Sequence, residues 1–209
     1  MQSAVNEGDE SHWDDVYERR GPTGVSWYQP EPTMSLTLIE RLGLQPEAAI
    51  LDVGGGASTL VDRLLAAGFR DVTVLDLSRT ALEVTQERVG PVERAHWVHH
   101  DVRTWTPRAA YDVWHDRAVF HFMVNAGDRE RYLSALNSGL RPGGHVIIAT
   151  FASDGPDHCS GLPVLRYDAG EIATALGPRF TVVDQVREEH TTPAEATQPF
   201  TWVLARASD

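Results

Sequence analysis

The stretch LDVGGGAST, residues 51–59, decides the fold of this chain. It passes from an apolar run through the carboxylate of Asp52 into three consecutive glycines, Gly54 to Gly56, and a helical pattern follows. Glycine lets a ligand approach the main chain closely, and the first turn of a helix offers N–H groups that lack intrahelical partners. The stretch therefore predicts a strand, a ligand-binding loop and a helix.

Short apolar runs with strand composition alternate with helical patterns along the rest of the chain. The expected strands are residues 48–53, 71–77, 95–102, 111–116, 145–151, 179–186 and 199–206, and the expected helices are residues 58–68, 78–89, 128–140 and 169–176. This alternation is typical of βαβ units and a parallel sheet. It predicts an α/β fold with a doubly wound, Rossmann-like sheet of seven strands, in which Ser58 and Ser78 cap two helices.

The composition fits one globular domain, residues 1–209, because 42% of the residues are hydrophobic. The 30 acidic residues outnumber the 18 Lys and Arg, and the net charge of −12 disfavours nucleic acid and anionic membranes as partners. The N-terminus lacks the apolar stretch of a secretory signal, and the longest apolar run, residues 145–152, is too short to span a membrane. A cytoplasmic protein is therefore expected, and its oligomeric state stays open.

Three segments fall outside the alternation: residues 1–32, 152–168 and 188–198. In an open α/β sheet, ligands bind at the carboxyl ends of the strands. The second and third segments follow the strands expected at 145–151 and 179–186, at that end of the sheet. Both are therefore expected to form loops on the substrate side of a site.

The residues around the glycines argue against a dinucleotide ligand. The fingerprint GxGxxG needs its third glycine where this chain has Thr59. Asp52 would repel a pyrophosphate but suits a cationic ligand, and S-adenosylmethionine carries both an ammonium and a sulfonium. Two more carboxylates end later strands. Asp76 stands where it can hold a ribose diol, and Asp101 stands where it can accept from an adenine amino group.

Five segments, ILDVGGGAS, VTVLDLS, HHDV, YDVWHDRAVFHF and LRPGGHVIIATF, resemble the ordered motifs of class I S-adenosylmethionine-dependent methyltransferases. The likeness is greatest to bacterial small-molecule and thiol methyltransferases. It implies a seven-stranded sheet whose last strand is antiparallel, and S-adenosylmethionine as the cofactor. The cofactor contacts that follow from the resemblance are Asp52, Gly54, Gly56, Ser58, Asp76, Leu77, Asp101, Val102 and His115.

The segment HWDDVYERRGPTGVSWYQ, residues 12–29, is similar to the N-terminal lid of small-molecule and thiol methyltransferases and of some protein-lysine methyltransferases. Trp13, Tyr17 and Trp27 are expected to cover the cofactor and to stabilise its sulfonium through their aromatic faces. Tyr28 is expected to face the substrate. The alternative is an amphipathic helix and turn that only pack on the domain.

The residues that meet the methyl acceptor are expected at the carboxyl ends of the later strands. Histidine is the side chain best suited to take a proton near neutral pH, and the candidate catalytic residues are His115, Asp116, His121 and His190. The candidate substrate contacts are Tyr28, Arg117, His158, Cys159, Arg166, Tyr167 and Gln198. Each histidine could instead be a hydrogen-bonded structural imidazole. Among His158, Cys159 and His190, no pair has a spacing typical of metal ligands, such as CxxC or HxxxH, so no metal site is expected.

These observations favour a methyltransferase that acts on a small molecule. Sulfur is favoured over oxygen or nitrogen as the acceptor atom, because YDVWHDRAVF resembles the matching segment of thiol and thiopurine methyltransferases. Two alternatives stay open: a protein-lysine N-methyltransferase, and a non-catalytic cofactor-binding partner subunit. The glycine loop does not separate a small-molecule acceptor from a protein-lysine acceptor, because it indicates the methyl donor and not the acceptor.

Overall fold

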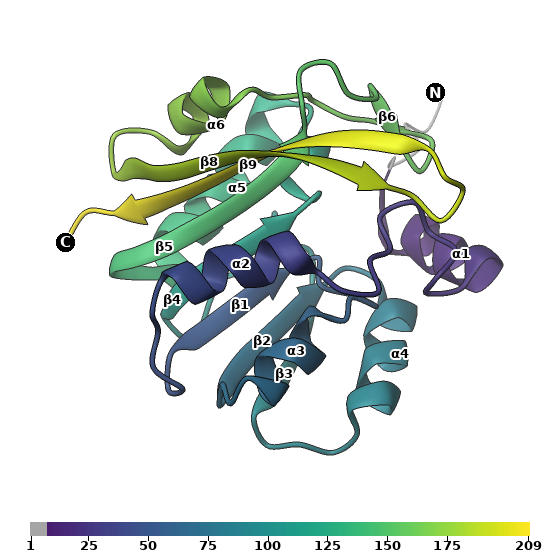
Figure 1. The fold of residues 1–209 in the computed structure, drawn as a ribbon, viewed down its shortest axis with the longest axis horizontal. Helices are drawn as coiled ribbons and strands as arrows, with labels where there is room; N and C mark the ends of the chain where they lie inside the picture. The colour runs from purple at the N-terminus through teal and green to yellow at the C-terminus, as the bar shows by residue number, and fades with distance from the viewer. Residues whose placement is uncertain (1–7) are drawn as a thin grey trace.

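A computed structural model describes residues 8–209, and the predicted seven-stranded sheet is present (Figure 1). The strand order is β3-β2-β1-β4-β5-β9-β8. The strands are β1 (Ala49–Val53), β2 (Asp71–Asp76), β3 (Ala95–His99), β4 (Tyr111–Arg117), β5 (Leu140–Phe151), β8 (Phe180–Thr191) and β9 (Thr197–Ala207). The first five pair in parallel, whereas β9 runs antiparallel to both β5 and β8. The predicted fold class, with its antiparallel last strand, is confirmed.

Helices cover both faces of the sheet, as a doubly wound fold requires (Figure 1). Apolar side chains of α2, α3 and α4 pack in one core cluster, and those of α5 and α6 pack in another. A third, smaller cluster joins Tyr17 of α1 to Ala81 of α4. The helices are α1 (Glu10–Arg20), α2 (Thr33–Arg41), α3 (Leu60–Ala66), α4 (Arg79–Val89), α5 (Ala126–Gly139) and α6 (Ala169–Leu176). The strand order reverses between β1 and β4, and the carboxyl edge at such a reversal is where open α/β sheets bind ligands.

The predicted helix caps are correct at one of two positions. The Ser78 hydroxyl accepts a hydrogen bond from the amide of Ala81 and begins α4, as expected. The N-cap of α3 is Thr59, one residue later than predicted, and its side chain makes no capping bond. Ser58 still contributes, because its hydroxyl accepts from the amide of Leu60 at 3.1 Å.

The segment 188–198, expected to be a loop, is mostly strand. β8 continues to Thr191 and β9 begins at Thr197, so the two strands form one long antiparallel hairpin. The apolar pattern fades after Val186 because β8 is an edge strand, and most of its side chains are exposed or half-buried. The segment 152–168 also contains a short hairpin, β6 (His158–Cys159) and β7 (Leu162–Pro163).

The N-terminal helix α1 is fixed to the start of α4 by one carboxylate. Asp14 accepts hydrogen bonds from the Ser78 hydroxyl at 2.6 Å and from the amide of Thr80 at 3.1 Å. A carboxylate at a helix N-terminus satisfies amides that lack intrahelical partners and interacts favourably with the helix dipole. The expected lid therefore has a firm attachment to the domain from residue 8 onward. Residues 1–7 of the expected segment 1–32 lie outside the described part of the chain.

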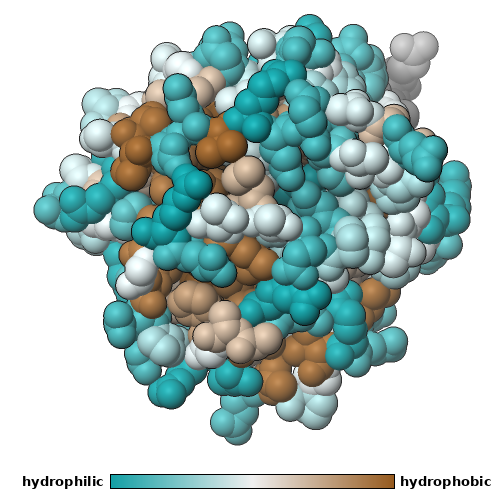
Figure 2. Space-filling view, viewed as in Figure 1, coloured by the Kyte–Doolittle hydropathy of each residue, from teal (hydrophilic) through white to brown (hydrophobic). Residues whose placement is uncertain are grey.

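Hydrophobic residues form separate patches among hydrophilic ones on the face shown in Figure 2. In the described part of the chain, the exposed large hydrophobic side chains are Val124, Val182 and Val183. Within residues 8–209, no helix combines the length and the apolarity that crossing a membrane requires.

A buried carboxylate holds the turn that follows β4. Asp116 is fully buried, and its oxygens accept from the amides of Val119 and Phe120 and from the Tyr132 hydroxyl at 2.6 Å. The Tyr132 oxygen in turn accepts from the Trp114 indole at 2.9 Å. Burial raises the pKa of Asp116 to about 6, although these hydrogen bonds oppose the shift. The network ties the turn, with its short helix η1 (Phe120–Phe122), to helix α5.

Replacing Asp116 with alanine should destabilise the protein. The change removes the acceptor for two buried amides and one buried hydroxyl, which we expect to cost about 2–4 kcal/mol in the free energy of unfolding. Urea denaturation measures this loss, and Asp157→Ala is the matched control because the Asp157 side chain is 76% exposed. Equal stabilities of the two variants would show that the network does not hold the turn.

Candidate functional site

Two adjoining cavities open at the carboxyl ends of β1, β2 and β4. The larger has a volume of about 160 Å³ and the smaller about 50 Å³. The residues that line both are Tyr17, Trp27, Val53, Gly54 and Arg117. The cavities are therefore two parts of one site, with the glycine loop and the N-terminal segment between them.

The glycine loop is crowded by side chains of the protein itself. Gly54 has a φ of +67°, and a Cβ there would collide with Val119. A Cβ on Gly55 would lie 2.5 Å from Oδ2 of Asp52, and one on Gly56 would lie 2.7 Å from Oδ2 of Asp76. The three glycines thus leave room for two carboxylates, as well as bare backbone that a ligand can approach.

Asp76 ends β2 and lines the larger cavity together with Leu77. One carboxylate oxygen accepts from the amide of Ser78 at 2.7 Å. Burial raises the pKa of Asp76 to about 7, and the nearby charge of Asp52 acts in the same direction. A ligand that donates hydrogen bonds to this carboxylate would favour its ionised form.

Asp52 and His115 form a buried pair beneath the smaller cavity. Nδ1 of His115 lies 2.7 Å from Oδ1 of Asp52, and Nε2 lies 2.9 Å from the Ser35 hydroxyl. Both ring nitrogens therefore have partners inside the protein. This arrangement orients the Asp52 carboxylate, and it makes His115 a positioning residue in the structure.

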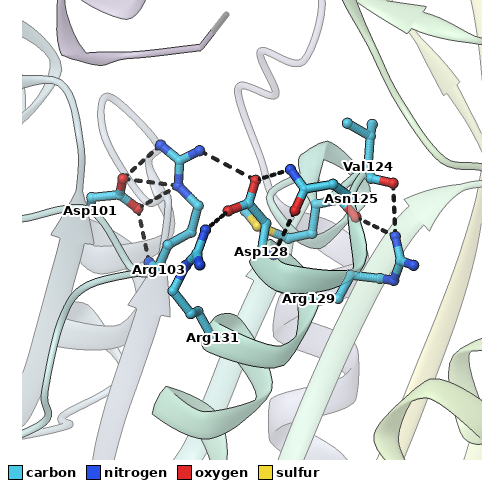
Figure 3. A network of polar contacts seen from close by, with 8 residues as sticks. Asp101, Arg103, Val124, Asn125, Asp128, Arg129 and Arg131 are labelled. Atoms are coloured by element: carbon cyan, nitrogen blue, oxygen red, sulfur yellow. Dashed lines mark hydrogen bonds and ion pairs between the residues drawn. The ribbon is translucent and has the colours of Figure 1, made fainter. Parts of the chain in front are cut away.

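A network of charged side chains begins at Asp101 and Arg103, which line the larger cavity, and continues to α5 (Figure 3). Arg103 donates to both oxygens of Asp101, at 2.9 Å from Nε and 2.6 Å from Nη2, and its Nη1 lies 3.7 Å from Asp128. Burial opposes ionisation of Asp101, but these hydrogen bonds and the charge of Arg103 lower its pKa. Asp128 also accepts from Asn125 at the start of α5. The loop after β3 is thereby fixed to α5.

Aromatic side chains from the N-terminal segment cover the larger cavity. Trp13 meets Trp27 and Phe122 edge to face, with ring centroids 5.8 and 5.1 Å apart. The Trp27 indole donates to the Tyr17 hydroxyl at 3.2 Å. Burial raises the pKa of Tyr17, so its hydroxyl stays protonated. The predicted lid residues Trp13, Tyr17 and Trp27 all line the cavity, and Tyr28 lines the smaller one.

The side of the site that faces β5 and β9 carries a guanidinium and a thiol. Arg117 donates from Nη1 to the backbone oxygen of Trp27 at 2.9 Å, and its guanidinium carbon lies 4.6 Å from the centroid of the Phe200 ring. Burial lowers the pKa of Arg117 to about 10, which leaves it charged at neutral pH. Burial also raises the pKa of Cys159 to about 12, so the thiol is neutral.

Several expected site residues do not line either cavity. Those that the structure places elsewhere are Gly56, Asp116, His121, His158, Arg166, Tyr167, His190 and Gln198. His121 is buried against Phe151, and burial together with the charge of Arg117 lowers its pKa to about 3. His190 donates to the backbone oxygen of Ser26 at 2.7 Å. The expectation that these side chains reach one common mouth is not met.

Other side chains line the cavity without having been predicted. They are mostly apolar or come from short turns, and they include Arg103, Val119, Phe122, Met123, Leu162 and Pro163. Val119 and Phe122 stand in the segment HDRAVFHF, and Phe122 lies one position after the His121 that was chosen. Apolar residues carry no chemical signal of their own, so only the position after β4 could have indicated them. Within residues 8–209, no group of three or more His, Cys, Asp or Glu side chains is placed to hold a metal ion.

Known proteins that are similar to this chain include several methyltransferases. Residues 50–144 match the family model described as a methyltransferase domain. The chain is similar to EEF1A lysine methyltransferase 2 of Danio rerio, at 28% identity over 159 residues, which cover 68% of each protein. It is also similar to malonyl-(acyl-carrier protein) O-methyltransferase 2 of Ilyobacter polytropus, at 23% identity over 137 residues. That match covers 63% of this chain and 52%, about half, of the relative.

Solved structures of methyltransferases have a similar fold. The 1,6-didemethyltoxoflavin-N1-methyltransferase of Burkholderia thailandensis, bound to its substrate and to S-adenosylhomocysteine, is 25% identical, with a TM-score of 0.69 over 96% of this chain and 84% of that one. An S-adenosylmethionine-dependent methyltransferase from Anabaena variabilis shares the fold, with a TM-score of 0.74 over 98% of both chains at 18% identity. The matched methyltransferase domain and the neighbour that holds S-adenosylhomocysteine support the class I S-adenosylmethionine-dependent methyltransferase that the sequence motifs indicate.

Proposed function

We propose that this enzyme methylates a small molecule, and that a thiol is favoured over oxygen or nitrogen as the acceptor. The observation that carries the proposal is the charge of the wall that faces β5 and β9. Arg117 lies there with the neutral thiol of Cys159. The carboxylates that line the cavities in the described part of the chain are Asp52 near the end of β1, Asp76 at the end of β2 and Asp101 after β3.

The remaining lining fits S-adenosylmethionine. In this proposal Asp76 accepts hydrogen bonds from the ribose, and the loop at Asp101 and Val102 binds the adenine. The aminocarboxypropyl group lies on the glycine loop above Asp52. The faces of Trp13 and Trp27 stabilise the cation at the sulfonium, which is worth about 0.5–2 kcal/mol for each contact.

The cofactor supplies a methyl group that is activated by the sulfonium. In the reaction, the acceptor atom forms a bond to the methyl carbon as the bond from that carbon to the sulfonium sulfur breaks, and the bonding electron pair stays on that sulfur. The chain contributes alignment of the two reactants and exclusion of water beneath the aromatic lid. The histidines that line the cavities within residues 8–209 are His100, next to Asp101, and His115, whose ring nitrogens are both held by Asp52 and Ser35. This arrangement favours an acceptor that ionises without a dedicated base. Thiols do so more readily than alcohols.

A protein-lysine acceptor is the second candidate, and the likeness to EEF1A lysine methyltransferase 2 favours it. The charge of the cavity opposes it. A lysine ammonium that entered beside Arg117 would meet a buried guanidinium, and like charges at close range in a site of low dielectric repel strongly. This repulsion is the physical reason to prefer a small acceptor.

The two candidates differ in where the methyl group is found. With S-adenosylmethionine labelled in the methyl group, we expect label in small thiols from a panel of aryl and alkyl thiols. Incubation with cell lysate should leave the protein precipitate unlabelled. Label that appears only in precipitated protein would overturn the small-molecule proposal and support the lysine alternative. A sample without enzyme gives the background for both arms.

The pKa of Asp76 predicts that cofactor binding depends on pH. Ribose hydroxyls that donate to the carboxylate stabilise its ionised form, so bound cofactor lowers the pKa from about 7, and affinity is lost as the pH falls through that value. Calorimetry with S-adenosylhomocysteine should show about tenfold weaker binding at about pH 6 than at about pH 8.

The Asp76→Asn variant is the control for this pH dependence. It cannot ionise at that position, so its affinity should be lower than that of the wild type at high pH and should change little with pH. The same pH dependence in both proteins would place the titrating group elsewhere and would contradict the ribose assignment.

A further inference from the structure

The guanidinium of Arg117 has one edge that no protein group uses. Nη1 donates to the backbone oxygen of Trp27, whereas Nε and Nη2 are buried and have no hydrogen-bond partner within residues 8–209. Nε and Nη2 lie along the same edge of the planar guanidinium and point two N–H groups in parallel. This fork has the geometry that binds both oxygens of a carboxylate.

The surroundings leave the charge of Arg117 only partly compensated. The carboxylate of Glu188 raises the pKa of Arg117 through its charge but makes no hydrogen bond to the guanidinium. The Glu188 oxygens accept instead from Gln29 at 3.1 Å and from the Trp202 indole at 2.8 Å. The other ionisable groups close to the guanidinium are the neutral thiol of Cys159 and the imidazoles of His121 and His190. None of these supplies an anion to the fork.

We propose that the Nε–Nη2 edge of Arg117 binds a carboxylate on the methyl acceptor, so that the enzyme selects thiols that carry a carboxylate over thiols that carry no charge. The inference rests on the proposed function and adds the second chemical group of the substrate. Arg117 lines both cavities, so the fork borders the site in which the acceptor would lie. An acceptor without the carboxylate leaves two buried donors unsatisfied, and such mismatches discriminate strongly between ligands.

The apolar part of the acceptor has a matching wall. Trp27, Phe122 and Leu162 line the same cavity as Arg117. Flat apolar groups pack well against aromatic rings. The acceptor class is therefore a compact apolar or aromatic thiol that carries a carboxylate.

The test compares two probes that differ in one charge. Enzyme loaded with S-adenosylhomocysteine is titrated in a calorimeter with para-mercaptobenzoate and with its methyl ester, so that binding is measured without turnover. The wild type should bind the acid at least about tenfold more tightly than the ester. Arg117→Met should lose this preference by weakening the acid alone, and Arg117→Lys should retain part of it because the charge remains without the fork. Arg70→Met, at an exposed arginine paired with Glu47, is the matched control and should behave as the wild type.

Equal affinities of the wild type for acid and ester, or a loss of both in Arg117→Met, would overturn the inference. Urea denaturation checks that each variant is folded, and if Arg117→Met is unfolded, the comparison rests on Arg117→Lys. Measurements of turnover separate the proposed carboxylate site from the proposed function. Transfer of methyl to acid and ester at equal rates contradicts the fork and keeps the proposed function. Tight, Arg117-dependent binding of the acid, without transfer to any thiol in the panel, keeps the fork and contradicts the function.

Discussion

The packing of carboxylates against the glycine loop is the constraint on which the site depends. Asp52 and Asp76 occupy the space where side chains at Gly55 and Gly56 would be, and Val119 occupies the space beside Gly54. The loop therefore contacts β1, β2 and the turn after β4 at the same time. Any side chain added there would displace a carboxylate or the turn before it touched a ligand. The glycines serve the shape of the protein and the approach of the cofactor together.

The donor half of the site was largely predictable from the sequence, because its chemistry is carried by few residues at the ends of strands. Asp52, Asp76 and Asp101 each follow an apolar run, and parallel strands bring such ends to one edge. All three line the cavities. The seven strands were predictable for the same reason, since buried strands read as apolar runs.

The acceptor half was much less predictable. Polar residues such as His158 and Arg166 were chosen by their position after a strand, but whether a side chain turns inward depends on packing that no local pattern encodes. The extension of β8 to Thr191 was missed because an edge strand has little apolar signal. Asp14 was missed as well, since its partners on α4 are distant in the sequence. Long-range contacts of this kind decide which of several similar side chains reaches a cavity.

The attachment of α1 through Asp14 also bears on how ligands enter. Helix α1 is fixed to α4, and Leu38 and Ile39 bury α2 in the core, so both ends of the intervening segment, residues 21–32, are tethered. That segment carries Trp27, and it contacts the sheet through Arg117 and His190. It begins at Gly21, which has a φ of +67°. The covering of the site is thus a strap with two fixed ends. A cover held at both ends is more restrained than a flap hinged at one end, and this restraint limits the size of the molecules that fit beneath it.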